Sequence, residues 1–526
     1  MGLHTKKLKL NIITTIGLGI LLTSCIFNNT EDSTTFLVPD QVLREHVSYF
    51  NRMNKEGVIN YISNAESADW LAANVPLFEA PDSTLEQIYY FRWWTFRKHL
   101  KQTPAGFVLT EFIRPVGHDG HFNTISSALG HHLYEGRWLA NSSYMDQYTI
   151  FWLVWEDYAE ESYMHKYSQW TADAIYNRYL VNQDQGFVTA LIKELDKDYL
   201  KWQREKQLPN GMYWQYDVRD AMEESISGSR TDKNARPTIN SYMYGNAKAI
   251  ANIAGMIGVD SLKAVYNQRA DRLQRQVQEN LWDPEEEFFK VLHPNGEFDD
   301  AREAIGFIPW YFGLPADSTA YGEAWRQLRN PEGFDAPMGL TTAERRHPEF
   351  RSSGVGTSEW DGAVWPFATT QTLKGLGRLL NNYENHPMNK EDFFRELKTY
   401  AKAHKKNGHP YIGEYHDEIN GYWLHGDNPR SRYYNHSGFA DLVIAGLVGL
   451  RPRADDTLQV NPLIPEEKWD WFALEDVHYH GHRLAIAWDR DGSKFGKGAG
   501  LRIWADEQLI HQADSLGPVT VPLPEK

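Results

Sequence analysis

The sequence predicts a mainly α-helical protein whose helices form an (α/α)6 toroid, followed by a small C-terminal β-sandwich. About a dozen amphipathic segments occur between residues 42 and 450, with apolar residues at three- and four-residue spacing. Clusters of Pro, Gly and Asn separate them. Six helical hairpins closing into a ring would use such a set of helices. After Arg453 the pattern changes to short alternating segments rich in Val, Ile, Leu and Trp.

The N-terminal residues predict export and lipid anchoring. A basic stretch precedes an apolar run over residues 12–22, which is typical of a signal peptide and too short to span a bilayer comfortably. The motif LTSC that follows resembles a bacterial lipobox, in which the cysteine is lipidated. We expect a signal peptide over residues 1–24, lipidation of Cys25 and a tether over residues 25–39. The expected location is the outer membrane, on its periplasmic face or at the cell surface.

Composition restricts the partners. The net charge of −16 argues against a nucleic-acid partner. Cys25 is the only cysteine, which excludes a disulfide within the chain and a cysteine-based metal site. Aromatic residues make up 13% of the chain, and many stand next to Asp, Asn, Arg or His. Aromatic faces stack on sugar rings while carboxylates and amides bind hydroxyls, so we expect an oligosaccharide partner derived from extracellular glycans.

The predicted helices belong to one domain, assigned to residues 40–452. The clearest helical segments, in chain order, are 85–100, 146–160, 187–206, 241–258, 261–281, 365–380 and 390–404. Turn sequences such as PNG and HPNG lie between such segments. The long aromatic loops are expected to gather at one mouth of the toroid.

The remaining residues, 453–526, are assigned to the β-sandwich, which we expect to pack on the helical domain. Segments such as RLAIAW and LRIW suit strands, and Asp-Gly or Gly turns separate them. No transmembrane segment is predicted after the signal region.

Two acid-bearing loops carry the predicted chemistry. The first follows residue 213 and places four acids within eight residues, beside aromatic side chains. The second begins near residue 412, about 190 residues later, and again sets carboxylates among Tyr, Trp, His and Asn. Glycoside hydrolysis requires one carboxyl group to protonate the leaving oxygen and a second to activate water or attack carbon. The candidates are Asp220, Glu223, Trp214, Arg236 and Asn240 in the first loop, and Glu414, Tyr415 and Arg432 in the second.

Three further loops combine polar and aromatic residues and are expected to contact substrate. Their candidate residues are His118 and Asp119, then Trp310, then Trp360, Asp361 and Trp365. For Trp310, a place in the core and a place in the pocket wall are equally compatible with the sequence, and Asp361 also suits the cap of the following helix. His118 and His121 offer metal-ligating nitrogens without an acidic partner at a fixed helical spacing. We therefore expect no metal ion and no cofactor.

The order of these motifs resembles the (α/α)6 glycosidases of clan G, namely families 37 and 63 and their mannosylglycerate-hydrolase-like relatives. The family loop ESGMD, followed by a helix with an Asn, is similar to DAME at residues 220–223 followed by Asn240. The family loop WRG-x-W-P is similar to WDGAVWP at residues 360–366, and its late Glu-Tyr pair is similar to Glu414-Tyr415. The resemblance covers most of residues 85–450 as short motifs in the same order.

The resemblance implies an inverting mechanism with a carboxylic general acid and a Glu general base. By motif, the acid falls on Glu223, where the family has an Asp, and the base falls on Glu414. Glu is one methylene longer than Asp, so Asp220, one turn away, stays an alternative acid. The overall prediction is an exo-acting, α-glycosidase-like glycoside hydrolase. The alternatives are a polysaccharide lyase on the same toroid, which would use SRYYNHS at residues 431–437, a non-catalytic glycan-binding lipoprotein, and a sugar epimerase.

Overall fold

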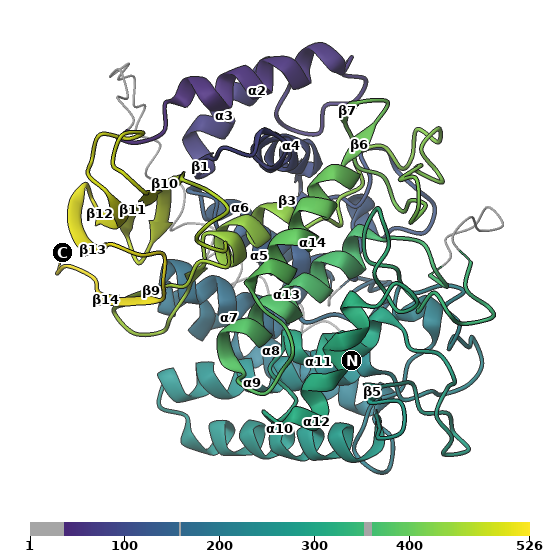
Figure 1. The fold of residues 1–526 in the computed structure, drawn as a ribbon. Coiled ribbons are helices and arrows are strands. Elements are labelled where there is room, and N and C mark those ends of the chain that lie inside the picture. The colour runs from purple at the N-terminus through teal and green to yellow at the C-terminus, as the bar shows by residue number, and fades with distance from the viewer. Residues whose placement is uncertain (1–35, 157–158, 352–359, 526) are drawn as a thin grey trace. The chain divides into compact units, whose positions relative to one another are not determined.

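The computed structural model of the protein describes residues 36–156, 159–351 and 360–525 (Figure 1). The predicted signal peptide, Cys25 and most of the predicted tether lie outside the described residues. In the described part of the chain, no helix combines the length and the apolar composition needed to cross a membrane.

An inner ring of helices forms the toroid. Its members are α5 (Leu129–Gly136), α7 (Thr171–Asn182), α9 (Pro237–Met256), α11 (Ile308–Tyr311), α13 (Pro366–Asn382) and α15 (Phe439–Asp441), which continues into the π-helix η7 (Leu442–Leu447). Each packs on the next, and α15 packs back on α5, so the ring closes. The predicted (α/α)6 toroid is confirmed.

Outer helices alternate with the inner ones along the chain. They are α4 (Ser83–His99), α6 (Ser143–Ile150), α8 (Gln185–Lys206), α10 (Asp260–Asn280), α12 (Thr319–Gly322) and α14 (Lys390–Ala403). The N-terminal helices α2 (Asp40–Met53) and α3 (Ser67–Asn74) pack on α4. Because inner and outer helices alternate, the inner helices all run in the same direction. The loops that precede them therefore open at one end of the ring.

One predicted helix differs from the observed structure. The segment 146–160 was expected to be a single α-helix, but α6 ends at Ile150 and continues as the π-helix η2 (Phe151–Trp155). Three successive bulky side chains, Phe151 to Leu153, are buried there, and a π-helical turn is wider than an α-helical one.

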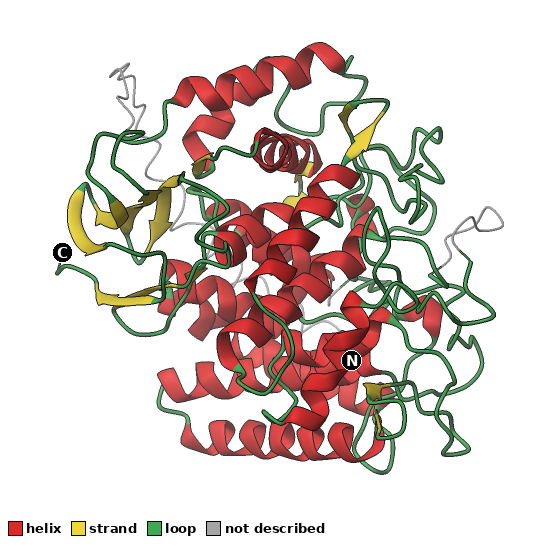
Figure 2. Cartoon of the chain, in the orientation of Figure 1, coloured by secondary structure: helices red, strands yellow, loops and turns green. Residues whose placement is uncertain are grey.

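The C-terminal region forms two antiparallel sheets, as the alternating pattern predicts. The larger has the order β1-β10-β11-β12-β13, and the smaller has the order β14-β9-β8. Their strands are β1 (Leu77–Glu79), β8 (Leu450–Arg451), β9 (Thr457–Val460), β10 (Trp471–Tyr479), β11 (His482–Asp489), β12 (Gly500–Ala505), β13 (Gln508–Ala513) and β14 (Val519–Pro522). Figure 2 shows these strands to one side of the helices.

Strand β1 was not predicted. It comes from near the N-terminus and pairs with β10, where Phe78 stands opposite Leu474. The pairing joins segments about 400 residues apart, so no local pattern could indicate it. Three short hairpins complete the strands: β2 (Leu100–Thr103) with β3 (Gly106–Leu109), β4 (Trp282–Asp283) with β5 (Phe288–Phe289), and β6 (Lys405–Lys406) with β7 (His409–Pro410).

Candidate active site

The predicted site loops precede inner helices. The loop with Glu223 leads into α9, the loop with Trp360 leads into α13, and the loop with Glu414 leads into α15. Long loops gather on the right of Figure 1, and the C-terminal sheets lie on the left. Two of the loops are joined directly, because Val364 and His416 exchange both backbone hydrogen bonds, each with a donor–acceptor distance of 3.0 Å.

Trp360 holds Glu223 in place. Its indole N–H donates to Glu223 Oε2 at 3.0 Å, and its backbone N–H donates to the carbonyl oxygen of Glu223 at 3.1 Å. On either side of this carboxylate, Ala221 and Glu224 have φ values of 59° and 57°. Left-handed conformations of non-glycine residues concentrate at functional sites, where the surrounding structure has to hold them.

The surroundings of Glu223 favour its protonated form. Burial raises the pKa of the Glu223 carboxyl, and the negative charges of Glu414 and Asp217 raise it further. The hydrogen bond from Trp360 lowers this pKa. The balance is upward, which suits a group that must carry a proton near neutral pH.

Stacked aromatic rings connect Glu223 to the loop of Glu414. The Trp360 and Trp365 ring planes are 17° apart, with centroids 4.0 Å apart, and Trp365 stacks in turn on Phe367 at 4.5 Å. The edge of Tyr415 meets the Trp360 ring at 5.3 Å. Aromatic stacks of this kind add stability beyond the area that they bury. Trp360 thus contacts one carboxylate and the residue next to the other.

Glu414 is buried and bound to basic and polar groups. Arg430 Nη2 donates to Glu414 Oε2 at 2.7 Å, and the hydroxyl of Ser431 donates to the same oxygen at 3.4 Å. His425 Nδ1 lies 3.6 Å from that oxygen. A guanidinium hydrogen bond favours the ionised carboxylate, the form that can accept a proton from water. Arg430 was not among the predicted site residues.

Glu111, also not predicted, is a third carboxylate of the site. Burial raises its pKa, and the charges of Glu414 and Glu223 raise it further, which places all three in one electrostatic neighbourhood. Glu111 lies two residues after β3 and seven residues before His118. In the sequence, Glu111 could have been recognised as an acidic residue between two apolar segments.

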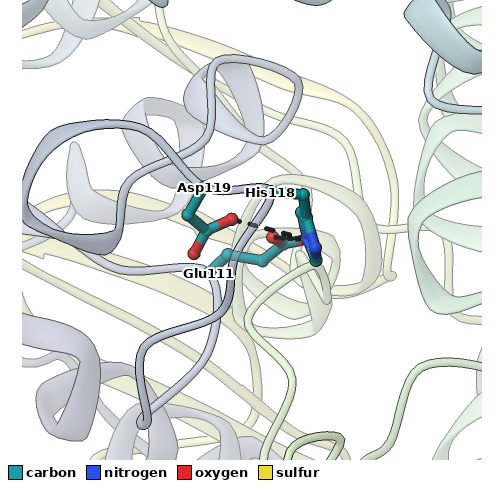
Figure 3. A group of neighbouring side chains, drawn as sticks. All are labelled: Glu111, His118 and Asp119. Atoms are coloured by element: carbon teal, nitrogen blue, oxygen red, sulfur yellow. Dashed lines mark hydrogen bonds and ion pairs between the residues drawn. The ribbon is translucent and has the colours of Figure 1, made fainter.

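Glu111 forms a cluster with His118 and Asp119 (Figure 3). His118 Nε2 lies 3.1 Å from Glu111 Oε2 and 3.5 Å from Asp119 Oδ1. Burial raises the pKa of both carboxyl groups. Glu111 raises the pKa of Asp119 further, whereas the hydrogen bond with Asp119 lowers the pKa of Glu111, so the pair is expected to retain one proton. Ligand atoms of the three residues lie within 4.8 Å of one another, so this group could hold a cation.

Two tyrosines line the same carboxylate group. Burial and the charges of Glu111, Glu414 and Glu223 raise the pKa of Tyr434 well above its ordinary value. Burial and the charges of Glu223 and Glu111 raise the pKa of Tyr167 likewise. Both hydroxyl groups therefore keep their protons and can donate hydrogen bonds.

Asp220 and Arg236 form a buried ion pair. Arg236 Nε donates to Asp220 Oδ2 at 2.8 Å, and both side chains are 0% exposed. Thr238 donates to the same oxygen. These contacts place both residues beneath the loop. The predicted contact between Arg236 and substrate is therefore wrong, because its guanidinium has no access to a bound sugar.

Asn240 and Trp310 are also interior residues, and for Trp310 this is the core position that the sequence left open beside the pocket wall. The Asn240 amide accepts from the backbone N–H of Tyr213 and donates to the carbonyl oxygens of Tyr213 and Arg236. These three hydrogen bonds fix the loop to α9. Trp310 is 0% exposed, and its ring meets Phe289 at 5.4 Å and Trp325 at 5.5 Å in the core.

Arg432 is directed away from Glu414. It contacts the Tyr433 hydroxyl at 3.2 Å and lines a separate cavity of about 120 Å³ together with Lys98. Tyr433 has a φ of 63°, and this left-handed residue turns the chain between Arg432 and the buried Tyr434. The basic residue that binds Glu414 is Arg430, and the predicted contact of Arg432 with substrate stays a prediction.

The other predicted residues lie in or next to the loops. Trp214 lies beneath the ammonium groups of Lys206 at 3.9 Å and Lys233 at 4.9 Å, so cations cover its ring. Asp361 is buried and accepts from Arg351 Nε at 2.5 Å. Trp365 is 1% exposed and supports Trp360 from behind.

We expect Trp360→Phe to move the pH profile of activity. A proton donor acts in its protonated form, so activity falls as pH rises through its pKa. Phenylalanine keeps the stack on Trp365 but lacks the indole N–H that lowers the pKa of Glu223. The basic limb of kcat/KM should therefore move to higher pH. Trp310→Phe, a change in the core, serves as the control, and a basic limb that stays in place would contradict the assignment of Glu223.

The chain matches known glycosidase families over most of its length. Residues 121–437, more than half of the chain, match the mannosylglycerate hydrolase MGH1-like glycoside hydrolase domain. Residues 450–511 match the C-terminal domain of glycosyl hydrolase family 65.

Solved structures show the same fold. A structure titled "Sialidase" shares 46% identity with a TM-score of 0.90, over 92% of this chain and 45% of that one. This chain therefore spans less than half the length of that relative. A family GH78 rhamnosidase of a Bacillus species has a TM-score of 0.60 at 12% identity, covering 82% of this chain and 41% of that one. The GH63 mannosylglycerate hydrolase from Thermus thermophilus in complex with glucose has a TM-score of 0.52 at 13% identity, covering 67% and 98%.

At 12% and 13% identity, the last two structures support the fold alone. The family match and the toroid agree with the predicted resemblance to clan G and with the predicted enzyme class. The chain belongs to the mannosylglycerate hydrolase MGH1-like family of glycoside hydrolases.

Proposed function

We propose that this protein is an exo-acting, inverting glycoside hydrolase that acts on oligosaccharides released from extracellular glycans. Glu223 is the general acid and Glu414 is the general base. One observation carries the proposal: Glu223, whose pKa is raised by burial and then by the charge of Glu414, shares a site with Glu414, to which Arg430 donates at 2.7 Å. Two carboxyl groups whose surroundings favour opposite protonation states are what acid–base hydrolysis of a glycoside needs.

The reaction proceeds by a single displacement. Glu223 gives its proton to the glycosidic oxygen as the bond from that oxygen to the anomeric carbon breaks. Glu414 takes a proton from the water molecule that attacks the anomeric carbon from the opposite face. The products are a free alcohol and a sugar of inverted anomeric configuration. Trp360, which binds Glu223 and packs against Tyr415, holds the two loops together.

The alternatives explain fewer of the contacts. A lyase neutralises a uronate carboxylate with positive charge before it removes a proton, whereas this site gathers the carboxyl groups of Glu111, Asp119, Glu223 and Glu414. A purely glycan-binding protein has no need for carboxyl groups of opposite protonation preference. The lyase would release an unsaturated product that absorbs in the near ultraviolet, and hydrolysis would not.

Proton NMR of the first-formed product tests the stereochemistry. Digestion of a panel of plant and microbial oligosaccharides identifies a substrate, and spectra are then recorded before mutarotation is complete. We expect the released sugar to have the opposite anomeric configuration to the substrate. Retention would overturn the direct attack of water and would assign Glu414 as a nucleophile.

For localisation, we propose attachment to the outer membrane through a lipid on Cys25, as the LTSC motif indicates. A protein that is stably anchored through its lipid is recovered in the membrane fraction. Cys25→Ala should move the protein into the soluble fraction after cell disruption. Continued recovery of this variant with membranes would contradict the anchor.

A further inference from the structure

A cavity of about 670 Å³ lies at the end of the toroid opposite the catalytic loops. Its wall includes the C-terminal part of α13, the π-helix η7 and the strands β8 and β9. Helix α13 begins directly after Trp365, and its residues line the cavity from Leu373 onward, about 10 Å along the helix axis from its start. The residues of the proposed active site do not line this cavity.

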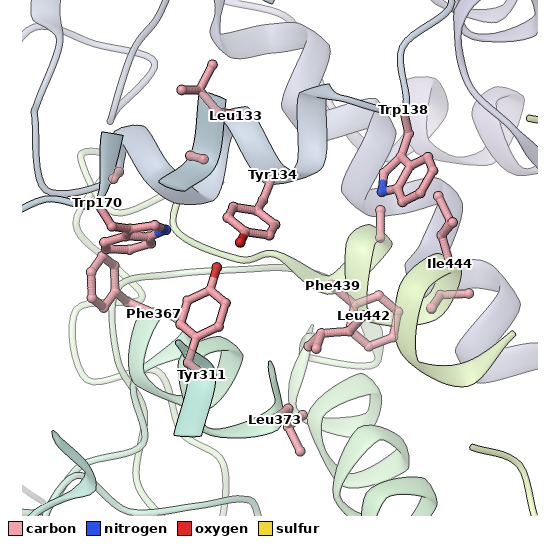
Figure 4. Close-up of a cluster of buried hydrophobic side chains, with 14 of the residues drawn as sticks. Leu133, Tyr134, Trp138, Trp170, Tyr311, Phe367, Leu373, Phe439, Leu442 and Ile444 are labelled. Atoms are coloured by element: carbon pink, nitrogen blue, oxygen red, sulfur yellow. The ribbon is translucent and has the colours of Figure 1, made fainter. Parts of the chain in front are cut away.

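Aromatic and charged side chains separate the cavity from the catalytic end of the toroid. Figure 4 shows the side chains of Tyr134 and Tyr311 pointing toward one another, with Trp170 and Phe367 to one side. The centroids of the two tyrosine rings are 5.6 Å apart. Lys374 Nζ lies 3.9 Å from the centroid of the Tyr134 ring. Ligands in the cavity are therefore separated from the catalytic carboxylates by packed side chains.

The cavity carries an excess of positive charge. Its lining contains two carboxylates, Asp441 and Asp455, and five basic side chains, which are Arg137, Lys374, Arg378, Arg451 and Arg453. Asp441 pairs with Arg137 at 2.9 Å and also with Lys374, and Asp455 pairs with Arg453 at 2.7 Å. This local excess occurs in a chain whose net charge is −16.

Arg378 and Arg451 provide the excess positive charge of the lining, although Asp173 attracts Arg378. Within the described part of the chain, neither has a carboxylate partner at ion-pair distance. Arg378 donates to the Tyr311 carbonyl oxygen at 3.1 Å, and Arg451 donates to Asn382 Oδ1 at 2.8 Å. Each guanidinium has five N–H donors, so further donors remain for a ligand.

The two guanidinium groups are close enough to repel each other. Burial, together with the positive charges of Arg378 and Arg453, lowers the pKa of Arg451 to about 10. Arg378 is exposed, so solvent screens part of this repulsion, and a bound anion would remove the remainder. The remaining lining includes the tyrosine rings of Tyr134 and Tyr176 and the amides of Asn177 and Gln459, which suit a sugar ring and its hydroxyls.

We propose that this cavity is a second saccharide site, which binds a sugar bearing a carboxylate, with Arg378 and Arg451 as the anion-binding pair. Planar guanidinium groups bind carboxylates in bidentate fashion. The volume lies within the range of small-molecule sites and is sufficient for a short oligosaccharide. The proposal is independent of the assignment of Glu223 and Glu414, because the cavity shares no residue with that site.

Isothermal titration calorimetry with glucuronate tests the proposal, with glucose as the neutral counterpart of the same ring. We expect the wild-type chain to bind glucuronate, more weakly as salt is added, and to prefer it over glucose. Each charge-assisted hydrogen bond that is lost should weaken binding by about 10-fold or more. The double variant Arg378→Gln/Arg451→Gln should therefore weaken glucuronate binding by about 100-fold or more.

Two further variants distinguish the loss of ligand binding from unfolding of the protein. Arg275→Gln removes one positive charge from the exposed face of α10 and should leave glucuronate binding unchanged. Arg451→Lys keeps the charge and should bind more tightly than Arg451→Gln at equal thermal stability. Absent binding to the wild-type chain, equal binding of glucose, or undiminished binding by the double variant would each overturn the proposal.

Discussion

Glu414→Ala is expected to lower kcat about 10²–10⁴-fold on every substrate, including substrates with good leaving groups. The reason is that activation of water does not depend on the leaving group. In the structure Glu414 accepts from Arg430 at 2.7 Å and is buried, so no bulk water replaces its carboxylate as a base in the correct position. Steady-state kinetics on a natural oligosaccharide and on aryl glycosides measure the effect.

A small anion should restore activity to Glu414→Ala, which lacks the base. Azide needs no deprotonation and can occupy the space left by the glutamate side chain, so it should restore turnover of an activated aryl glycoside by Glu414→Ala. The product should be a glycosyl azide of inverted configuration. Arg430→Gln leaves the carboxylate in place without its guanidinium partner, and we expect an intermediate loss. A Glu414→Ala enzyme that keeps wild-type kcat and melts at the wild-type temperature would refute the base assignment.

Glu223→Gln is expected to have the second largest effect, and its size should depend on the leaving group. On a natural oligosaccharide we expect kcat/KM to fall about 10²–10⁴-fold, because the alkoxide leaving group needs a proton. On a dinitrophenyl glycoside the loss should stay within about 10-fold, because this leaving group departs without protonation. Glu224→Gln is the matched control, since Glu224 is exposed, adjacent and paired with Arg230.

Asp220→Asn distinguishes the alternative acid. The variant leaves the buried guanidinium of Arg236 without its partner, which typically costs about 3–5 kcal/mol of the free energy of unfolding. We therefore expect a lower melting temperature and a loss of activity that is similar for all leaving groups. If Asp220→Asn shows the leaving-group dependence and Glu223→Gln does not, then Asp220 is the general acid.

Local sequence patterns were sufficient to predict most of the long helices. The segment predicted at 241–258 corresponds to α9 (Pro237–Met256), and the segment at 365–380 corresponds to α13 (Pro366–Asn382). Apolar spacing and turn residues act within a few residues of each other, so they can be recognised in the sequence. The exception, at 146–160, arises where successive bulky side chains produce a π-helical turn.

The sequence was sufficient to predict which loops carry the catalytic acids, but not which residues of those loops contact each other. The two acid loops were identified because acids and aromatics stand next to each other in the sequence. Neither Glu111 nor Arg430 stands out in this way. Arg430 and Arg432 have the same chemistry and are two residues apart, and only the fold of their loop decides that Arg430 reaches Glu414.

Several predicted residues proved to hold the loops rather than face a ligand. Asn240 and Arg236 have the polar groups that a sugar site requires, but their partners are the backbone of Tyr213 and the carboxylate of Asp220. A buried polar group must be paired, and a backbone group serves as well as a ligand. Composition cannot distinguish these two uses.

The sequence by itself determined the order of helices, the C-terminal strands, the two loops that carry acids and their resemblance to clan G. Periodicity, turn chemistry and motif order are properties of neighbouring residues. Only the tertiary structure decided that Trp360 binds Glu223, that Arg430 binds Glu414, and that Arg378 and Arg451 meet in a cavity behind the toroid. These contacts join residues from about 15 to nearly 140 positions apart. The contact of Trp360 with Glu223 and the meeting of Arg378 with Arg451 depend on packing of the inner helices, whereas the contact of Arg430 with Glu414 depends on the fold of one long loop.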